Sequence, residues 1–342
     1  MDSNDPVDPH LVEVMHAVFA SYREHNEPTL STVGRDRSFW DQLNGLGLIR
    51  LTGAEESGGS GAGWREAAEL ARAAAWHGVH TGIEEHDLLA CWLLEATGLP
   101  VDAAPRTVCV VDGSGTARGV PWAADSDKIV IAWAGPDEYL VADLSRTDCN
   151  VTAGANVAGE PRDTVRVDID SLSGTATTAT VVCSLMLRGA LIRAVQLSAV
   201  LDRIVELAVF HTTERQQFGR PLAKFQSVQN LVADMAAEAS LARAATEAAV
   251  AEAVTSDWSS KKLKFMVAVA RSCAGHAASV VVRNAHQVHG AIGTTHEHRL
   301  HEFTKPALAW RSEFGSMRYW DQHLTSAAVD AGRTGLWTLI AG

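Results

Sequence analysis

Hydrophobic residues recur at spacings of three and four over most of the C-terminal half of the chain, which is the spacing of one buried helix face. Three long amphipathic helices are predicted here, and further helix follows after Glu297. We therefore expect residues 184–342 to form a C-terminal four-helix bundle. The long predicted helices cover approximately residues 187–219, 225–254 and 259–289, the first of them ending at Gly219 because Pro221 prevents its continuation.

The N-terminal third shows shorter stretches of the same periodicity, separated by Gly, Pro and polar residues. Gly98 and Pro100 are stop signals for the last of these stretches. Residues 1–104 are therefore predicted to be an N-terminal helical domain. Its predicted helices span about Pro9–Tyr22, Phe39–Leu46, Trp64–Trp76 and Glu84–Glu95.

The pattern changes from Thr107 onward to short runs of β-branched residues between turn-forming Gly, Pro, Asp and Ser. These runs predict a small middle β-domain over residues 105–183 and give the chain an α+β fold. The predicted strands are Thr107–Val111, Lys128–Trp133, Glu138–Val141, Val165–Asp168 and Ala179–Val182.

Composition and charge narrow the classes of partner. The chain is 46% hydrophobic and 20% charged, with a formal net charge of −12. An acidic surface offers no broad attraction to DNA or to anionic membranes, so neither partner is expected. Five cysteines form no C-x-x-C pair, and their odd number argues against a complete disulfide framework. They are expected to be buried small hydrophobic residues in a reducing compartment.

The N-terminal sequence lacks the basic and apolar regions of a signal peptide, and no uncharged stretch of about twenty apolar residues occurs elsewhere. A cytoplasmic protein is expected. His296-Glu-His298 is a single His-x-His without further spaced Cys or carboxylate ligands, and solvated histidines on a turn explain it better than a metal site. No metal is therefore predicted.

Two motifs carry candidate chemistry. The first reads Arg215-x-x-Phe218-Gly219-x-Pro221-Leu222-x-x-x-Gln226, and the second reads Gln287-Val-His-Gly290-Ala-Ile-Gly293 followed by Glu297. A guanidinium can fork onto a pyrophosphate, and glycines let backbone N–H groups approach it. The alternative is that Arg215 caps a helix C-terminus and the glycines only stop helices.

Together these motifs, in this order and on helices of this length, resemble those of the acyl-CoA dehydrogenases. The resemblance implies an N-terminal helical domain, a middle β-domain and a C-terminal helical bundle. It also implies that Arg215, Phe218, Gln287, Gly290 and Gly293 contact the ADP half of an FAD held mainly by a neighbouring subunit.

Two departures from the family accompany the resemblance. The family's middle domain carries Thr-Glu-Pro-x-x-Gly-Ser-Asp and Trp-x-Thr-Asn segments that hold the flavin ring. Residues 111–117 and 131–135 stand at those places and match neither. The usual catalytic base is the glutamate of a Glu-Gly-Thr segment, and counting from Gly290 its position holds Phe314. An alternative family position, near Gly189-Ala190, is not acidic either, which leaves Glu313 as a displaced candidate.

These departures predict the non-catalytic chain of a heteromeric enzyme. The chain resembles the short, degenerate partners in α2β2 acyl-CoA dehydrogenases of actinobacterial steroid degradation, which implies a steroid-derived CoA thioester as substrate, as in cholesterol catabolism. In that reading it completes the FAD site of a catalytic partner chain. Two alternatives stay open, namely a self-sufficient homo-oligomeric dehydrogenase that uses Glu313, and a non-redox structural or regulatory protein on the same scaffold.

Overall fold

The computed structural model describes residues 7–26 and 34–341. The described chain forms two compact units, one up to Gly189 and one from Ala190 onward. The first unit holds the helices and strands predicted for the N-terminal and middle domains. The division into three domains, with boundaries at 104 and 183, therefore stays a prediction.

The N-terminal helices lie where the hydrophobic periodicity placed them. The last one differs in kind, because its first part is a π-helix, η2, rather than an α-helix. A π-helix is rare and widens the backbone spiral by one residue per turn. The helices of this region are α1 (Pro9–His25), α2 (Arg37–Gly45), η1 (Glu55–Ser57), α3 (Trp64–His77), η2 (Glu85–Cys91) and α4 (Trp92–Ala96).

The middle region contains two small sheets. One has the order β1-β3-β4-β7, in which β1 and β3 are parallel and the other pairs antiparallel, and the other has the order β2-β6-β5. Their strands are β1 (Arg106–Val110), β2 (Thr116–Pro121), β3 (Lys128–Ala134), β4 (Tyr139–Ser145), β5 (Asn150–Thr152), β6 (Arg162–Arg166) and β7 (Thr175–Thr177), with short 3-10 turns η3 (Arg146–Asp148) and η4 (Ile169–Ser171).

Apolar side chains from both sheets share one core. Ile129, Ile131 and Trp133 of β3 belong to it together with Val165 of β6. The predicted strand Ala179–Val182 is wrong, because these residues form the first turn of a helix, α5. Their β-branched content mimics a strand, but they continue the long helix that follows without a break.

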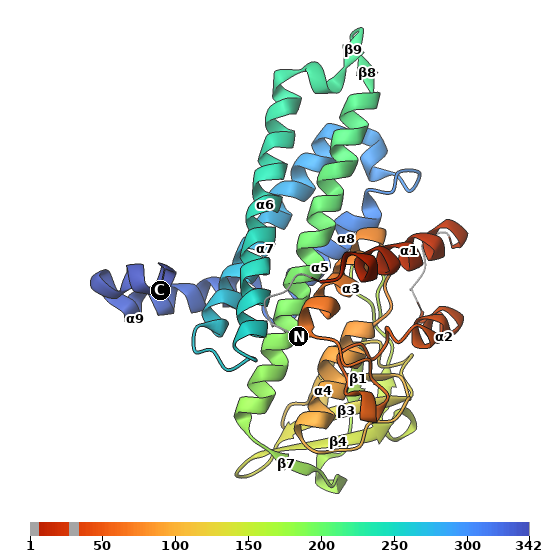
Figure 1. Cartoon of the computed structure of the whole chain (residues 1–342), viewed down its shortest axis with the longest axis vertical. Coiled ribbons are helices and arrows are strands. Elements are labelled where there is room, and N and C mark those ends of the chain that lie inside the picture. The colour runs from red at the N-terminus through yellow and green to blue at the C-terminus, as the bar shows by residue number, and fades with distance from the viewer. Residues whose placement is uncertain (1–6, 27–33, 342) are drawn as a thin grey trace. The chain divides into compact units, whose positions relative to one another are not determined.

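The second unit is helical. Figure 1 shows α5 and α6 running side by side to the small β8–β9 hairpin that joins them, and Arg243 of α6 donates to Asp202 of α5 at 2.9 Å. The predicted bundle is thus confirmed as helical packing. Its elements are α5 (Ala179–Glu214, which begins in the first unit), β8 (Gln216–Gln217), β9 (Arg220–Pro221), η5 (Leu222–Lys224), α6 (Gln226–Thr255), α7 (Leu263–His289), η6 (Gly290–Thr294), α8 (His301–Trp310) and α9 (Met317–Ala341).

The first long helix ends five residues earlier than Gly219, the predicted end. It ends at Glu214, and the following residues form a tight hairpin in which Gly219 has φ +78°. Glycine tolerates this left-handed conformation, so it marks the turn rather than the helix end. The backbone N–H of Leu222 donates to the carbonyl oxygen of Arg215 at 2.8 Å and closes the hairpin.

Two segments, Ala179–Glu214 and Leu263–Thr294, are long and apolar enough to cross a membrane by length and composition alone. Most of each apolar window is buried inside the protein, as in core helices of soluble proteins, and both helices carry buried arginines. This is weak evidence for a membrane span. The cysteines differ partly from expectation, since Cys91, Cys109 and Cys149 are buried whereas Cys183 is exposed.

Candidate functional site

The first motif forms the exposed tip of the α5–α6 hairpin. Arg215 directly follows α5, its backbone N–H donates to His211 at 2.9 Å, and its side chain is exposed. Phe218 has φ +52° and a side chain that is 92% exposed. A bulky residue in the left-handed region with its ring presented to solvent is unusual, and such strained residues cluster at functional sites. The tip therefore presents a cation and an aromatic ring outward.

Arg220 lies in the same tip but is engaged locally. Its guanidinium lies 4.1 Å from the ring centroid of Phe225, and the Phe218 ring meets the Phe225 ring edge-on at 6.3 Å. This arrangement is a cation–π contact that braces the hairpin. Arg220 is thus a natural comparison for Arg215, with the same charge in the same turn.

The second motif closes α7. Gln287 is exposed on its last turn, and Gly290 follows with φ +62° and ψ −142°, a conformation that a side chain would disfavour. No atom lies within 4 Å of where a Cβ would stand on Gly290, so a ligand could approach that face of its backbone, while its N–H donates to the carbonyl oxygen of His286. Gly293 differs, because it is buried and a Cβ there would come within 2.7 Å of the His289 Cβ. Gly293 is therefore required for packing.

Both motifs lie at one end of the bundle. The ring of His211, one turn before Arg215, stacks on the ring of His289, two residues after Gln287, with centroids 4.5 Å apart. An exposed guanidinium, an exposed amide and an open glycine backbone are thus gathered from segments more than seventy residues apart in sequence. Such groups suit a pyrophosphate.

The loop that carries the family's base position is fixed by a buried arginine of α7. Arg271 is 1% exposed, and its Nη2 donates to the carbonyl oxygens of Trp310, Arg311, Glu313 and Gly315 at 2.7–3.3 Å. Burial, with a smaller effect of nearby Arg193, lowers the pKa of Arg271 to about 10. Phe314 within this loop has φ +52° and is partly buried. The hydrogen bonds from Arg271 therefore fix the conformation of this loop, and the positive φ of Phe314 strains its backbone locally.

Glu313 is not a free carboxylate. Arg193 of α5, 2% exposed in its side chain, donates its Nε to Glu313 Oε2 at 2.7 Å and its Nη1 to Gln196 Oε1 at 2.5 Å. The same guanidinium lies 5.7 Å from the centroid of the Phe314 ring. A buried ion pair stabilises the charge of the carboxylate and occupies one of its oxygens, which opposes proton abstraction from a substrate.

The two segments at the family's flavin-ring places serve the β-domain itself. Asp112 Oδ1 accepts the backbone N–H groups of Ser114 and Thr116 and the Ser114 hydroxyl, which closes the β1–β2 turn. Ile131 and Trp133 are core residues of β3, exposed by 0% and 4%. The Ser114 hydroxyl, which hydrogen-bonds with Asp112 and Thr116, is engaged within its own turn.

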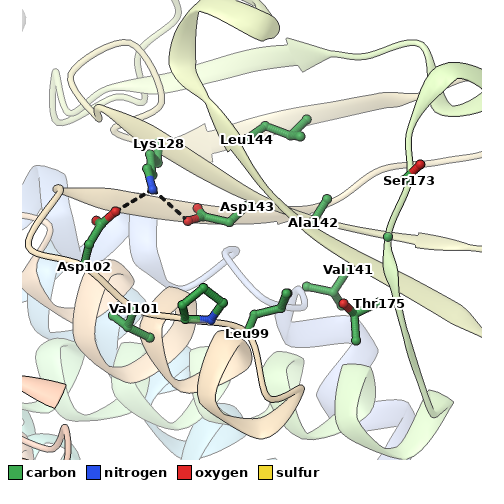
Figure 2. Close-up of a pocket in the computed structure, with 12 residues that line it drawn as sticks. Leu99, Val101, Asp102, Lys128, Val141, Ala142, Asp143, Leu144, Ser173 and Thr175 are labelled. Carbon is green, nitrogen blue, oxygen red and sulfur yellow. Dashed lines mark hydrogen bonds and ion pairs between the residues drawn. The ribbon is translucent and has the colours of Figure 1, made fainter. Parts of the chain in front are cut away.

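The β-domain carries an open hollow of about 580 Å³ along β4, shown in Figure 2. Its wall is apolar, with Leu99, Val101 and Val141 among its lining residues. At one end, Lys128 Nζ lies between Asp102 Oδ2, at 2.6 Å, and Asp143 Oδ2, at 3.3 Å. One cation stands against two carboxylates, so this end of the hollow offers no net positive charge with which to hold an acyl-CoA phosphate.

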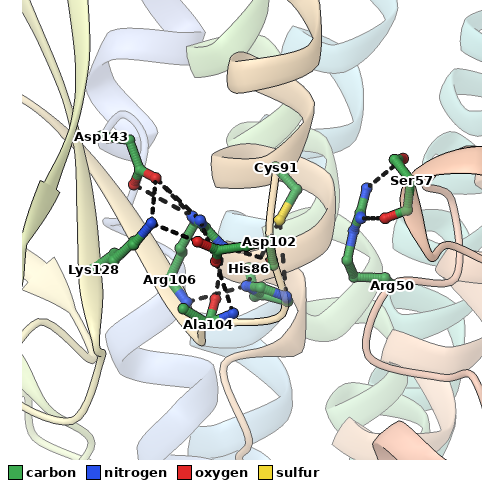
Figure 3. Close-up of polar contacts among 9 residues, drawn as sticks. All are labelled: Arg50, Ser57, His86, Cys91, Asp102, Ala104, Arg106, Lys128 and Asp143. Carbon is green, nitrogen blue, oxygen red and sulfur yellow. Dashed lines mark hydrogen bonds and ion pairs between the residues drawn. The ribbon is translucent and has the colours of Figure 1, made fainter. Parts of the chain in front are cut away.

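Those acids belong to a network centred on the fully buried Arg106, shown in Figure 3. Its guanidinium donates to Asp143 at 3.0–3.3 Å, to Asp102 Oδ1 at 2.6 Å and to the carbonyl oxygens of Asp102 and Ala104 at 2.8 Å. Burial opposes ionisation of Asp102, but hydrogen bonds from Lys128, Ala104 and Arg106 outweigh it and hold the pKa of Asp102 below its usual range. The network is structural.

Another buried acid, Asp87 of η2, has hydrogen bonds to only one of its two carboxylate oxygens. Its Oδ2 accepts the backbone N–H and the hydroxyl of Thr52 at 2.9 and 3.0 Å, while its Oδ1 is buried without a hydrogen-bond partner. Burial, partly offset by the Thr52 hydrogen bonds, raises the pKa of Asp87 to about 6. The folded protein therefore binds a proton here in mildly acidic solution that the unfolded chain does not.

The sign of the resulting stability change follows from this pKa. A raised carboxyl pKa means that the contribution of Asp87 to the free energy of unfolding falls as pH rises from about 4 to about 6. The Asp87→Asn variant has no carboxyl group to titrate here. Its free energy of unfolding, relative to that of the parent, should therefore rise by about 3 kcal/mol between about pH 4 and about pH 6. Urea unfolding of both proteins at a series of pH values measures the difference.

Asp112→Asn is the control with the opposite sign. Asp112 is fully exposed, and its hydrogen bonds from Ser114 and Thr116 lower its pKa. Its contribution to stability should therefore be present at neutral pH and fade as pH falls, the reverse of the Asp87 trend. Parallel profiles for the parent and Asp87→Asn would contradict the assignment.

The residues that connect the loop at Phe314 and the two motifs to neighbouring helices have no signal in the sequence motifs. Arg193 and Arg271 belong to no motif, although a charged residue on an otherwise apolar helix face indicates a buried partner. His211 has no local signal either, because its neighbour His289 lies on another helix. Pairing across helices is not encoded in local spacing.

Comparison with known proteins finds both a matching family and matching folds. Residues 179–317 match the family described as "Acyl-CoA dehydrogenase, C-terminal domain". A relative, "Acyl-CoA dehydrogenase IpdE2" from Mycolicibacterium smegmatis, is 31% identical over 118 residues, which are 34% of this chain and 35% of the relative. The chain thus matches this curated relative over about a third of its length.

Solved structures match nearly the whole chain. The ChsE4-ChsE5 complex from Mycobacterium tuberculosis contains a chain that superposes with a TM-score of 0.83 at 18% identity, covering 96% of this chain and 99% of that one. A variant of the Tcur3481-Tcur3483 steroid ACAD gives 0.82 at 20% identity, with coverage of 95% and 98%. The protein therefore has the acyl-CoA dehydrogenase fold, and its residues 179–317 match the C-terminal domain of the acyl-CoA dehydrogenases.

Proposed function

We propose that this chain is a subunit of an FAD-dependent acyl-CoA dehydrogenase that lacks its own catalytic base and completes the FAD site of a catalytic partner chain. The reaction removes hydrogens from the α and β carbons of a CoA thioester. FAD supplies the hydride acceptor for the β-hydrogen, and a carboxylate must take the α-proton. The match of residues 179–317 to the acyl-CoA dehydrogenase C-terminal domain supports the proposed reaction class. The division of labour between the chains is the second part of the proposal.

The loop at Phe314 carries this proposal. The position that holds the base in the family is occupied by a phenyl ring, and the neighbouring carboxylate of Glu313 is paired with buried Arg193 at 2.7 Å. Arg271 donates to the carbonyl oxygen of Glu313, so the loop cannot readjust to bring the Glu313 carboxylate into the position of Phe314. No acid is therefore poised for an α-proton in this loop.

The residues expected to contact the ADP half of FAD, in contrast, are placed as such contacts require. Arg215 and Gln287 are exposed and Gly290 has an open backbone, so these three fit the pyrophosphate and ADP side of an FAD. Phe218, exposed in the same tip, can contact the cofactor from outside this chain's own core. Residues that face outward suit a cofactor held mainly by a neighbour.

Partner and substrate class rest on the structural neighbours and the degenerate sites. The chains it superposes on include one from a complex of two differently named subunits and one from a steroid ACAD. We propose an α2β2 heterotetramer with a catalytic chain, acting on a steroid-derived CoA thioester in the cytoplasm.

Flavin content tests the composite site. The complex with the catalytic chain, identified by co-purification with the product of a neighbouring gene, should contain about one FAD per two chains. Arg215→Ala should weaken FAD binding by about 10- to 100-fold, because a charge-assisted hydrogen bond contributes about 1.5–3 kcal/mol. Absorbance of the purified complexes against protein concentration gives the occupancy.

Arg220→Ala is the matched control, since it removes the same charge from the same hairpin but breaks only the contact with Phe225. It should keep the FAD of the parent complex. One FAD per chain, or full retention in Arg215→Ala, would refute the composite site. A complex without any flavin would favour the non-redox scaffold.

A further inference from the structure

Three histidines from separate segments meet beside the two motifs. His211 lies on α5, His289 is the last residue of α7, and His298 lies in the turn between η6 and α8. One ring nitrogen of each lies within 4.8 Å of the others. The ring centroids are 4.5 Å apart for His211 and His289, 4.6 Å for His289 and His298, and 6.0 Å for His211 and His298.

His289 is held as a ligand would be. His289 is 5% exposed, and its Nδ1 lies 2.7 Å from the carbonyl oxygen of Ala285. A carbonyl can only accept, so Nδ1 carries the proton and Nε2 carries a lone pair. That Nε2 is buried and has no hydrogen-bond partner. A buried nitrogen without a partner is unfavourable and calls for an explanation.

Burial, opposed by the hydrogen bond to Ala285, lowers the pKa of His289 to about 4, and burial also lowers the pKa values of His211 and His298. These directions favour neutral imidazole, which is the form that binds metals.

We propose that His211, His289 and His298 together bind one divalent transition-metal ion of the zinc type. Imidazole nitrogens suit Zn²⁺, Co²⁺, Ni²⁺ and Cu²⁺, and a site with three histidines leaves a position open for water or for another ligand. The unpartnered Nε2 of His289 gains its missing partner in the bound state. The site stands on this cluster alone and does not depend on FAD binding.

Closing the site requires small movements. Zn–N distances of about 2.0–2.1 Å in a tetrahedral site place ligand nitrogens about 3.3 Å apart. His211 and His298 are only partly buried and can approach, whereas His289 is fixed by its contact with Ala285. The Nδ1 of His298 accepts the N–H of Leu300 at 3.1 Å, so its proton is on Nε2. Binding a metal through Nε2 moves that proton to Nδ1 and gives up this hydrogen bond.

The structure also separates this cluster from the His-x-His motif in the sequence. His296 is exposed and its ring meets that of His301, with centroids 5.1 Å apart, while His298 faces the other two histidines of the cluster. His296→Ala is therefore the matched control for His298→Ala, because both remove an imidazole from one turn.

Metal titration of the flavin-free full chain, prepared without a histidine tag and stripped with a chelator, tests the proposal. Calorimetry with Zn²⁺ should give one site per chain, and Co²⁺ should give the visible absorption of a tetrahedral site. His211→Ala and His298→Ala should each weaken binding at least about 100-fold, because even changes behind a ligand cost about 10- to 100-fold. His296→Ala should bind as the parent does.

His289→Gln is included with a thermal unfolding measurement, since this buried residue also packs against Gly293. Should it fail to fold, the two partly exposed histidines still decide the question. Absence of saturable binding by the parent, parent-like affinity in His211→Ala, or equal losses in His296→Ala and His298→Ala would overturn the site. The FAD occupancy of the complex is a separate measurement, so either proposal can fail without the other.

Discussion

The isolated chain is expected to give no acyl-CoA dehydrogenase turnover, even when supplied with FAD. The base position holds Phe314, and Glu313 is paired with Arg193, so no positioned carboxylate can take the α-proton. Loss of a general base lowers rates by about 10²- to 10⁴-fold relative to a complete site. Flavin reduction by a series of acyl-CoA thioesters, followed by absorbance for the chain alone and for its complex, measures the difference.

Two variants sharpen this test. Phe314→Glu should not make the isolated chain active, because a base restores the reaction only where a flavin ring is held against the substrate, and residues 111–117 and 131–135 serve the β-domain. Glu313→Gln should leave turnover of the complex unchanged, since glutamine can still accept a hydrogen bond from Arg193. Turnover by the isolated chain that disappears in Glu313→Gln would establish the self-sufficient alternative.

Arg106→Met is expected to destabilise the first unit by about 3–5 kcal/mol. Removing the fully buried guanidinium takes the donor from two carbonyl oxygens and leaves Asp143 with the longer contact to Lys128, and breaking a buried ion pair from one side is strongly destabilising. Methionine fills a similar volume, which limits the cavity contribution to the loss. Chemical denaturation of the parent and the variant gives the change in free energy of unfolding.

Lys128→Met is the matched control within the same network. Lys128 contacts the same two carboxylates, but its side chain is 32% exposed, so water can replace its hydrogen bonds. Its loss should cost about 1 kcal/mol or less. Equal losses in the two variants would mean that burial of Arg106 does not decide its contribution.

Local chemistry in the sequence determined most of the elements. Helical periodicity predicted α1, α3, α6 and α7 to within a few residues, because an amphipathic helix must repeat its apolar positions with the turn. The fold family followed from two motifs whose glycines and prolines have fixed backbone preferences. Where β-branched residues open a helix, as at Ala179–Val182, the local signal misled, since packing along α5 overrides strand propensity.

The tertiary structure decided which charged and polar groups meet. Arg193 and Glu313 are 120 residues apart, and nothing in the spacing of either indicates that α5 would neutralise the carboxylate next to the base position. His211 and His289 likewise meet only because α5 and α7 end together. Sequence fixes the period of each helix face, but contacts between faces depend on how helices pack, and packing sums many weak terms that no short motif carries.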